Sequence, residues 1–251
     1  MIVVCKGDGH PMNTKINLNQ IAAIKSLNSD EIYNEIYQQI IDLTYEPGSM
    51  LSENKMVQTY KVSRTVIRTV FSRLQQLGFL EVYPQRGTFV SLIDLNYIAD
   101  LLMLRTALEK EVIYELITRL SEEKLNTLID KLEANMLLQE QCIHEQDYFG
   151  EMPALDAQFH EAMIQSVRRE SLVALLNPYL GHIARWRNFD IPFDKRIPEI
   201  IQQHRNILEA LKTKDIMKTQ MELEKHLETI TAVSERAMKE YPSFFIRQQE
   251  R

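Results

Sequence analysis

Residues 51–90 hold the pattern that most constrains the fold: two short helical segments, a turn between them, and two β-type runs that follow at once. Ser52 and Ser63 stand where the two helices would begin, and a serine side chain can accept a hydrogen bond from the free backbone at a helix N-terminus. Gly78 would end the second helix. The runs 80–83 and 88–90 flank a turn-forming loop, Pro84-Gln85-Arg86-Gly87. The pattern therefore predicts two helices and a β-hairpin.

The same segment carries a strong local positive charge. Residues 55–86 contain six basic side chains and one acidic side chain, a balance of +5, whereas the whole chain has a net charge of −6. The rest of the chain therefore holds 23 basic and 34 acidic residues, a balance of −11. A basic face on an otherwise acidic protein suits contact with phosphate. Combined with the order helix, turn, helix and hairpin, this charge predicts a winged helix-turn-helix that binds double-stranded DNA.

The second helix of this segment would enter the major groove. We expect Arg64 and Arg68 to contact bases or phosphate, because an arginine can bind guanine through two hydrogen bonds. At the hairpin tip, Arg86 suits the negative potential of the adjacent minor groove, and Gly87 lets the backbone turn tightly. The predicted DNA-binding residues are Ser63, Arg64, Thr65, Arg68, Arg86 and Gly87, with the two hydroxyl side chains on phosphate.

The sequence on either side of this segment is helical in pattern. A preceding helix begins near Asn28-Ser29 and repeats an apolar residue every fourth position at Ile32, Ile36 and Ile40. From Asp94 onward helical patterns follow one another, at about 95–120, 121–145, 150–168, 170–188, 196–212 and 215–240. We therefore predict a mainly α protein: a winged helix-turn-helix over 27–92, joined by a short junction to an all-α domain over 95–241 that binds a ligand and forms a homodimer.

Composition narrows the class of protein. The two cysteines, Cys5 and Cys142, are far apart and lack metal-binding spacing, so reduced thiols are expected. No apolar run approaches the roughly 18 residues of a membrane span, and we predict a cytoplasmic protein. Residues 1 to about 25 show no sustained period, and Met12 is an alternative start to Met1. We assign that segment no function.

Four polar residues in the all-α region have spacings that metal binding would require. Asp156 and His160 lie four apart, so on a helix they project from one face. His204 and His226 lie on two later helices joined by a turn, and an antiparallel pair would bring them to similar heights. Spacing alone leaves two interpretations open, because a histidine on a helix is as often a core or surface residue as a metal ligand.

The DNA-binding segment resembles the GntR family of bacterial transcription regulators. The resemblance lies in Val62–Arg68 (VSRTVIR), in Leu74–Leu80 (LQQLGFL), in Pro84–Val90 (PQRGTFV) and in the preceding Pro47–Glu53 (PGSMLSE). The chain departs from the family pattern at Asn54, where some members carry an arginine that contacts DNA, and at Val66, where proline is common. The resemblance implies a DNA-binding role, whereas the operator sequence does not follow from it.

The C-terminal region resembles the FCD type of GntR effector domain, and the likeness covers about residues 27–240. Many members bind a metal through one aspartate and three histidines, and Asp156, His160, His204 and His226 match that set. The resemblance implies a divalent metal, zinc first with nickel, manganese or iron as alternatives. Branches that bind long acyl-CoA esters generally lack the set, which argues against such a ligand.

Three imidazoles and one carboxylate leave coordination positions open on an octahedral ion, and a small organic acid would complete the shell as the effector. Arg105, which matches a family position that often faces the cavity, and Arg185 are the predicted partners of a second carboxylate. For Arg105 the alternative is a surface ion pair with Glu109. A symmetric homodimer would require an inverted-repeat operator.

Two other functions fit parts of this pattern. The metal itself would be the signal in a metal-responsive repressor. A metallohydrolase would use the metal to activate water, but the sequence contains no HExxH, GxSxG or glycine-rich phosphate loop. The prediction is therefore a regulator and not an enzyme.

Overall fold

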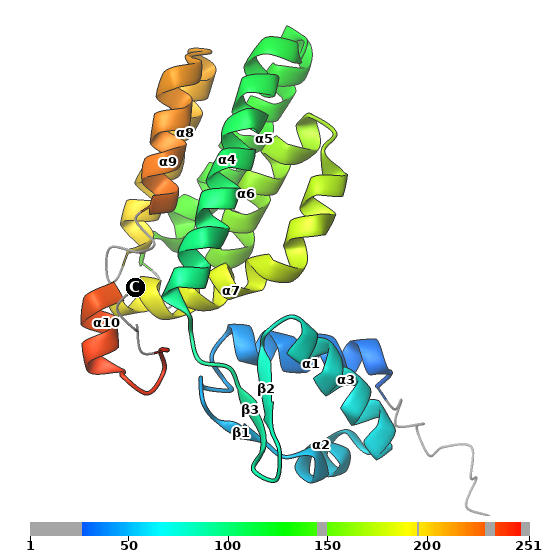
Figure 1. The fold of residues 1–251 in the computed structure, drawn as a ribbon. Coiled ribbons are helices and arrows are strands. Elements are labelled where there is room, and N and C mark those ends of the chain that lie inside the picture. The colour runs from blue at the N-terminus through cyan, green and yellow to red at the C-terminus, as the bar shows by residue number, and fades with distance from the viewer. Residues whose placement is uncertain (1–26, 145–149, 195, 229–233, 247–251) are drawn as a thin grey trace, which may run out of the picture.

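The computed structural model describes residues 27–144, 150–194, 196–228 and 234–246. Residues 1–26, which include Cys5 and Met12, lie outside the described residues. An N-terminal winged helix-turn-helix is followed by an all-α domain (Figure 1), so the predicted fold class is confirmed. In the described part of the chain, no helix is both long enough and apolar enough to cross a bilayer.

The three helices of the N-terminal domain begin at side-chain caps. They are α1 (Ser29–Ile41), α2 (Glu53–Tyr60) and α3 (Arg64–Gln76). The Asn28 side chain accepts hydrogen bonds from two N–H groups at the start of α1, while Ser52 and Ser63 cap α2 and α3. Lys61 adopts a left-handed conformation (φ 54°) between α2 and α3. These caps fix where α3 starts and therefore which side chains its first turn presents.

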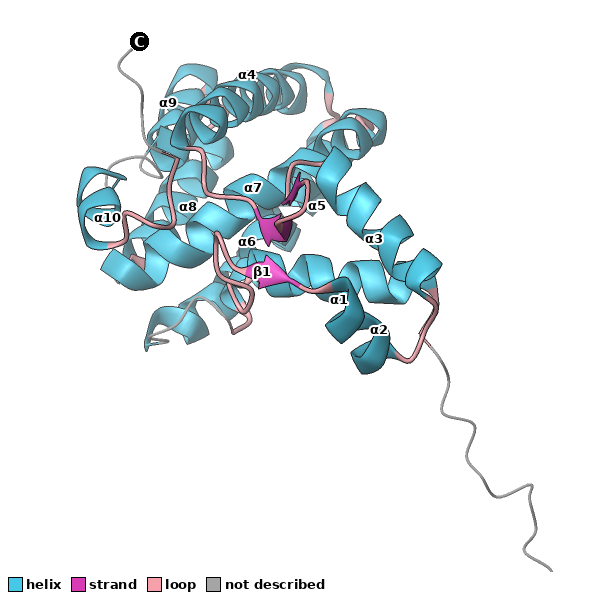
Figure 2. Cartoon of the chain, turned by 60° about the horizontal axis from the view of Figure 1, so that its bottom comes forward, coloured by secondary structure: helices cyan, strands magenta, loops and turns pink. Residues whose placement is uncertain are grey.

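A three-stranded antiparallel sheet forms the wing, in the order β1-β3-β2. Strands β2 (Leu80–Tyr83) and β3 (Gly87–Val90) make the predicted hairpin, with Leu80 opposite Val90. Strand β1 (Met50–Leu51) pairs with β3 through Met50 and Phe89. Figure 2 shows β1 beside the end of α1. The two-residue β1 is too short for a period in the sequence to reveal it.

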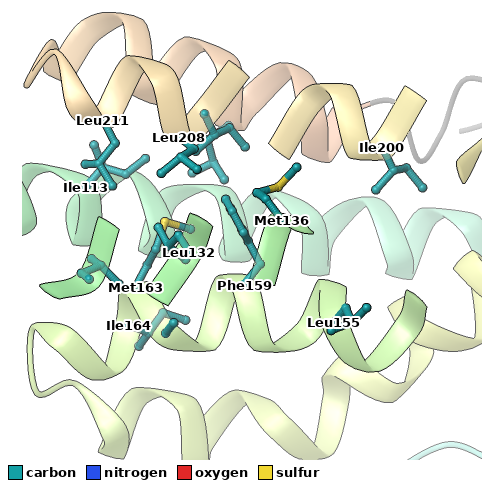
Figure 3. Packing of buried hydrophobic residues seen from close by; sticks show 14 of the residues in the cluster. Ile113, Leu132, Met136, Leu155, Phe159, Met163, Ile164, Ile200, Leu208 and Leu211 are labelled. Carbon is teal, nitrogen blue, oxygen red and sulfur yellow. The ribbon is translucent and has the colours of Figure 1, made fainter. Parts of the chain in front are cut away.

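The all-α domain has a main apolar core and a second apolar cluster near the junction with the N-terminal domain. Its helices are α4 (Leu95–Arg119), α5 (Glu122–Gln141), α6 (Met152–Ser166), α7 (Glu170–Asp194), α8 (Ile197–Lys212), α9 (Ile216–Glu228) and α10 (Ser234–Glu240). A short 3-10 turn, η2 (Cys142–His144), follows α5. In the core (Figure 3), Phe159 of α6 lies with Met136 of α5 and Leu208 of α8, and all three are buried. The span 215–240, expected as one helix, contains both α9 and α10, and residues 229–233 lie outside the described part of the chain.

Helix α7 lies between the bundle and the winged helix-turn-helix (Figure 1) and contacts both. Its Asn188 donates a hydrogen bond to the carbonyl of Ile41 at the end of α1, at 2.8 Å. At Gly181 a β-carbon would lie 2.1 Å from the Tyr37 hydroxyl oxygen, so the Tyr37 side chain of α1 packs directly on the backbone of α7. The two domains therefore meet through direct helix-to-helix contact.

The C-terminal segment returns to the junction between the domains. Ile93 pairs with Phe245 in a parallel bridge, and its N–H donates to the carbonyl of Phe244 at 2.8 Å. The Phe245 ring lies against Phe189 and Trp186 of α7, with centroids 5.5 and 6.0 Å apart. The junction is therefore held on one side by α7 and on the other by the C-terminal segment.

Candidate metal and effector site and DNA-binding surface

The four predicted metal ligands come together in the all-α domain. Helix α6 supplies Asp156 and His160, α8 supplies His204, and α9 supplies His226. All four are buried, and one potential ligand atom from each lies within 4.8 Å of the others. Because α8 and α9 form an antiparallel pair, His204 and His226 lie side by side although they are 22 positions apart in sequence.

Each histidine is held through its Nδ1 atom. The distances are 2.6 Å from His160 to Glu109 Oε2, 2.8 Å from His204 to Gln139 Oε1, and 3.0 Å from His226 to Gln203 Oε1. An acceptor on one ring nitrogen fixes the tautomer and turns the other nitrogen toward a common centre. Sequence reasoning did not include Glu109, Gln139 or Gln203 in the site.

Neighbouring hydrogen bonds fix which way the two glutamine amides point. Gln139 donates its NH₂ to Asn135 Oδ1 at 2.6 Å, and Gln203 donates its NH₂ to Glu199 Oε1 at 3.0 Å. Their carbonyl oxygens are therefore left to accept from the histidine Nδ1–H groups. The Nε2 atoms of neutral His204 and His226 then carry lone pairs and no proton.

These lone pairs face the centre of the cluster, where a cation would bind them. The Nε2 atoms of His160 and His226 lie 3.2 Å apart, a distance at which two acceptors need a proton or a cation between them. His204 Nε2 is buried without a hydrogen bond and lies 3.4 Å from Asp156 Oδ1. Nitrogen and carboxylate oxygen donors at one point suit zinc and several other divalent metals. The donor set therefore fits a divalent cation.

Burial also keeps His204 and His226 in the neutral form that binds metals. It lowers the pKa of His204 to about 3 and holds the pKa of His226 well below its ordinary value. For Glu109 burial opposes ionisation, but the neighbouring His160 and Arg105 outweigh it and lower the pKa to about 2. The site therefore combines two neutral imidazoles with an ionised carboxylate behind the third histidine, His160.

A cavity of about 600 Å³ adjoins the cluster. Its polar wall includes Asp156, His160, Glu109 and two arginines, Arg105 of α4 and Arg187 of α7. Arg187 donates two hydrogen bonds to the Asp156 carboxylate, at 2.5 and 2.7 Å, and helps to hold the pKa of this buried acid low. Arg105 lines the cavity while its Nε donates to Glu109 Oε1 at 2.6 Å, so the predicted ion pair and the cavity position occur together.

The second predicted effector residue, Arg185, lies elsewhere. Its guanidinium donates to the carbonyl and hydroxyl oxygens of Ser91, just after β3, at 2.5 and 3.2 Å. Residues two apart on a helix point about 200° away from each other. Arg187 therefore faces the cavity, whereas Arg185 ties α7 to the end of the winged helix-turn-helix.

The predicted DNA-binding residues share one exposed surface of the N-terminal domain. Ser63, Arg64, Thr65 and Arg68 are exposed, because Ile67, Val70 and Phe71 form the buried side of α3. Two of the cations already have partners on α2: Arg64 donates to Asn54 Oδ1 at 2.8 Å, and Arg68 pairs with Glu53 at 3.1 Å. At the wing tip, Arg86 and Gly87 are exposed, and the φ of Gly87 is 113°.

Comparison with known proteins agrees with this architecture. The family described as "Bacterial regulatory proteins, gntR family" matches residues 28–90, and the FCD domain matches residues 100–229. A transcriptional regulator from an unstable DNA locus of Streptomyces ambofaciens is 27% identical over 219 residues, which is 87% of this chain and 89% of that protein. The transcriptional repressor RspR of Escherichia coli is 24% identical over 81% of this chain and 87% of its own length.

The fold has a solved counterpart. A GntR-type transcriptional regulator from Rhodococcus sp. RHA1 superposes with a TM-score of 0.63 at 19% identity, covering 83% of this chain and 98% of that structure. The relatives are transcription regulators and not enzymes. The chain belongs to the gntR family of bacterial regulatory proteins and is a DNA-binding transcription regulator whose C-terminal part is an FCD domain.

Proposed function

We propose that this regulator holds a divalent metal through Asp156, His160, His204 and His226, and that a small carboxylate bound beside that metal changes its affinity for DNA. The observation that carries the proposal is the arrangement of three buried histidines, each held at Nδ1, around one carboxylate oxygen. Zinc is the first choice, with nickel, manganese and iron as alternatives, because imidazole and carboxylate donors suit all four.

The cavity supports a carboxylate as the effector. When bound, the metal would supply a Lewis-acid site for one carboxylate oxygen. Arg105 and Arg187 both line the cavity next to the cluster, and their positive charges favour a carboxylate there. The terminal nitrogens of Arg187 already donate to Asp156, whereas Arg105 pairs with Glu109 through Nε, so Arg105 is the proposed partner of the effector carboxylate. No acyl-CoA is proposed, because a polar, arginine-lined end does not suit a long hydrocarbon chain.

Exposed apolar residues on the all-α domain support a homodimer. On α7 the side chains of Leu172, Leu175 and Tyr179 are 36%, 68% and 40% exposed, and on α4 Leu104 is 50% exposed. Large apolar side chains grouped on a surface mark an interaction site. A two-fold dimer would present two α3 helices to an inverted-repeat operator of double-stranded DNA.

The test separates metal binding from DNA binding. Metal content of purified protein and its binding to DNA from its own promoter region are measured for the wild type, for His204→Ala, and for Arg64→Ala plus Arg68→Ala. His204→Ala should lose the metal and keep its DNA shift, and the double arginine variant should keep the metal and lose the shift. Wild-type protein without stoichiometric metal would refute the proposed site.

The metal-responsive alternative predicts a different result from the same protein. If chelation alone changes DNA affinity as fully as any ligand does, and a panel of organic acids has no effect on metal-loaded protein, the metal is the signal. If the metal-loaded protein responds to an acid, the metal anchors the effector instead.

A further inference from the structure

The cavity beside the metal cluster has a wall that comes from the other domain. Alongside residues of α4, α6 and α7, it is lined by Tyr37, Gln38, Ile41 and Asp42 of α1. Helix α1 belongs to the winged helix-turn-helix and packs against both α3 and α7. A molecule that fills the cavity therefore touches the DNA-binding domain directly.

The cavity is too large for the head group of an acid alone. Its volume of about 600 Å³ compares with roughly 30 Å³ for one water molecule in the liquid. Helix α1 follows α7 along this cavity, with Tyr37 at Gly181 and the Ile41 carbonyl 2.8 Å from the Asn188 side chain. A ligand anchored at the metal therefore has room for a tail that reaches α1.

Two parts of the cavity wall differ in chemistry. Beside the cluster Arg105 and Arg187 would attract a carboxylate. On the α1 wall Asp42 and Gln38 offer carboxylate and amide oxygens that accept hydrogen bonds, which suits hydroxyl groups on the tail. A second carboxylate there would face the Asp42 carboxylate, and like charges repel. One oxygen of Asp42 accepts from the Thr44 N–H at 3.0 Å, which fixes the side chain at the end of α1.

We propose that Gln38 and Asp42 of α1 form a second recognition site for the effector, and that they bind the polar tail of a small organic acid whose carboxylate is bound at the metal. The inference rests on the proposed function, because it needs an acid anchored at the cluster. The effector is then held between the two domains. Ligand binding and the position of α1 are thermodynamically linked. A ligand whose affinity depends on the position of α1 must therefore favour one position of α1, and with it one placement of α3.

The experiment uses 2-hydroxy acids that share one head group and differ in the tail. Glycolate has no tail, gluconate has a polyhydroxy tail, malate has a second carboxylate, and mandelate has an aromatic ring. Their affinities for the metal-loaded full chain are measured by calorimetry for the wild type, Gln38→Ala and Asp42→Asn. Gln39→Ala is the matched control, since it is the same substitution one residue on and its side chain pairs with Glu35 at 3.2 Å.

We expect gluconate to bind the wild type best. Gln38→Ala should weaken gluconate by about 5- to 10-fold, the value of one hydrogen bond, and leave glycolate unchanged. Asp42→Asn keeps an oxygen for Thr44 and removes the charge, so malate should bind it several-fold more tightly than it binds the wild type. A gain in affinity cannot come from misfolding. Gln39→Ala should behave as the wild type.

The outcomes separate this inference from the function on which it rests. If acids bind but neither Gln38→Ala nor Asp42→Asn changes the order of affinity of the four acids, α1 does not recognise the tail of the effector. Only this inference then fails. If no acid binds the metal-loaded protein, the proposed effector site fails and the inference fails with it.

Discussion

His182 of α7 lies flat against Phe79, the residue that leads from α3 into β2. Their ring centroids are 4.0 Å apart and their planes differ by 6°. The His182 Nε2–H donates to the carbonyl of Leu77, the C-cap of α3, at 2.7 Å. The helix that lines the effector cavity therefore also contacts the end of the helix that faces DNA.

The first prediction concerns pH. Burial lowers the pKa of His182, outweighing the Leu77 carbonyl, while Arg185 lowers it and Asp94 raises it. As pH falls below about 6.5, the ordinary histidine value, the unfolded chain takes up a proton that the folded chain resists. Contact between the domains should therefore lose stability from about pH 6.5 downward. Urea unfolding of the full chain between pH 7.5 and 5.5 measures the loss.

His182→Phe is the control for this prediction, because phenylalanine can stack on Phe79 but has no group that titrates. The free energy of unfolding of this variant should fall less over the same pH range than that of the wild type. Equal slopes for the two proteins would mean that His182 does not cause the dependence.

The second prediction concerns the residues behind the metal ligands. Gln139→Leu removes the acceptor that orients His204, and the loss of such a partner typically lowers metal affinity by about 10- to 100-fold. Competition with a chelating dye measures this. The control is Gln202→Leu on α8, an exposed glutamine that pairs with Asn206. Should both variants hold the metal as tightly as the wild type, Gln139 would have no role in the site.

The third prediction concerns DNA recognition. Arg68→Ala should weaken binding to the operator by about 1–3 kcal/mol if Arg68 reads a base, with less discrimination at that position. Arg73→Ala is the matched control, because Arg73 is bound to Asp30 at 2.6 Å and covers the Tyr33 ring at 4.0 Å. Titrations against the operator and against unrelated DNA, at two salt concentrations, separate base contact from phosphate contact. An equal loss on both DNAs would place Arg68 on phosphate.

The fourth prediction concerns the C-terminal segment. Phe245 is 3% exposed and its chain pairs with Ile93 at the domain junction. Phe245→Ala should release this pairing, because it removes a buried ring worth up to about 3–5 kcal/mol. Amide exchange at Ile93 should then become faster. Ile246→Ala is the control, since that side chain is 43% exposed, and exchange at Ile93 should stay slow.

Local patterns explain what could be predicted from the sequence. Helix starts at Asn28, Ser52 and Ser63 follow from cap residues, which act over three or four positions. The pairing of Asp156 with His160 followed from their spacing and that of His204 with His226 from an antiparallel helix pair, while the family resemblance joined the two pairs into one set. These inferences succeed because each depends on periodicity or on short-range hydrogen bonding.

Relationships between helices were harder to predict. Arg185 and Arg187 are two residues apart in the same run, and only the packing of α7 decides which one faces the cavity. Glu109 and Gln139 were missed because they act through histidines 51 and 65 positions away. The return of Phe245 to Ile93 spans most of the all-α domain. The spacing of residues within one helix or strand does not indicate which distant segments will pack against it.

The contact at Gly181, where α1 and α7 touch, predicts the phenotype of mutations at this position. Any other residue would place a β-carbon 2.1 Å from the Tyr37 hydroxyl oxygen and 2.9 Å from Phe79, so these two side chains of the N-terminal domain would have to move. A single missense change in codon 181 would thus alter the contact between the domains without touching the metal ligands or the DNA-facing arginines. A screen for alleles that no longer respond to their signal, but still yield stable protein that binds metal, should recover this codon.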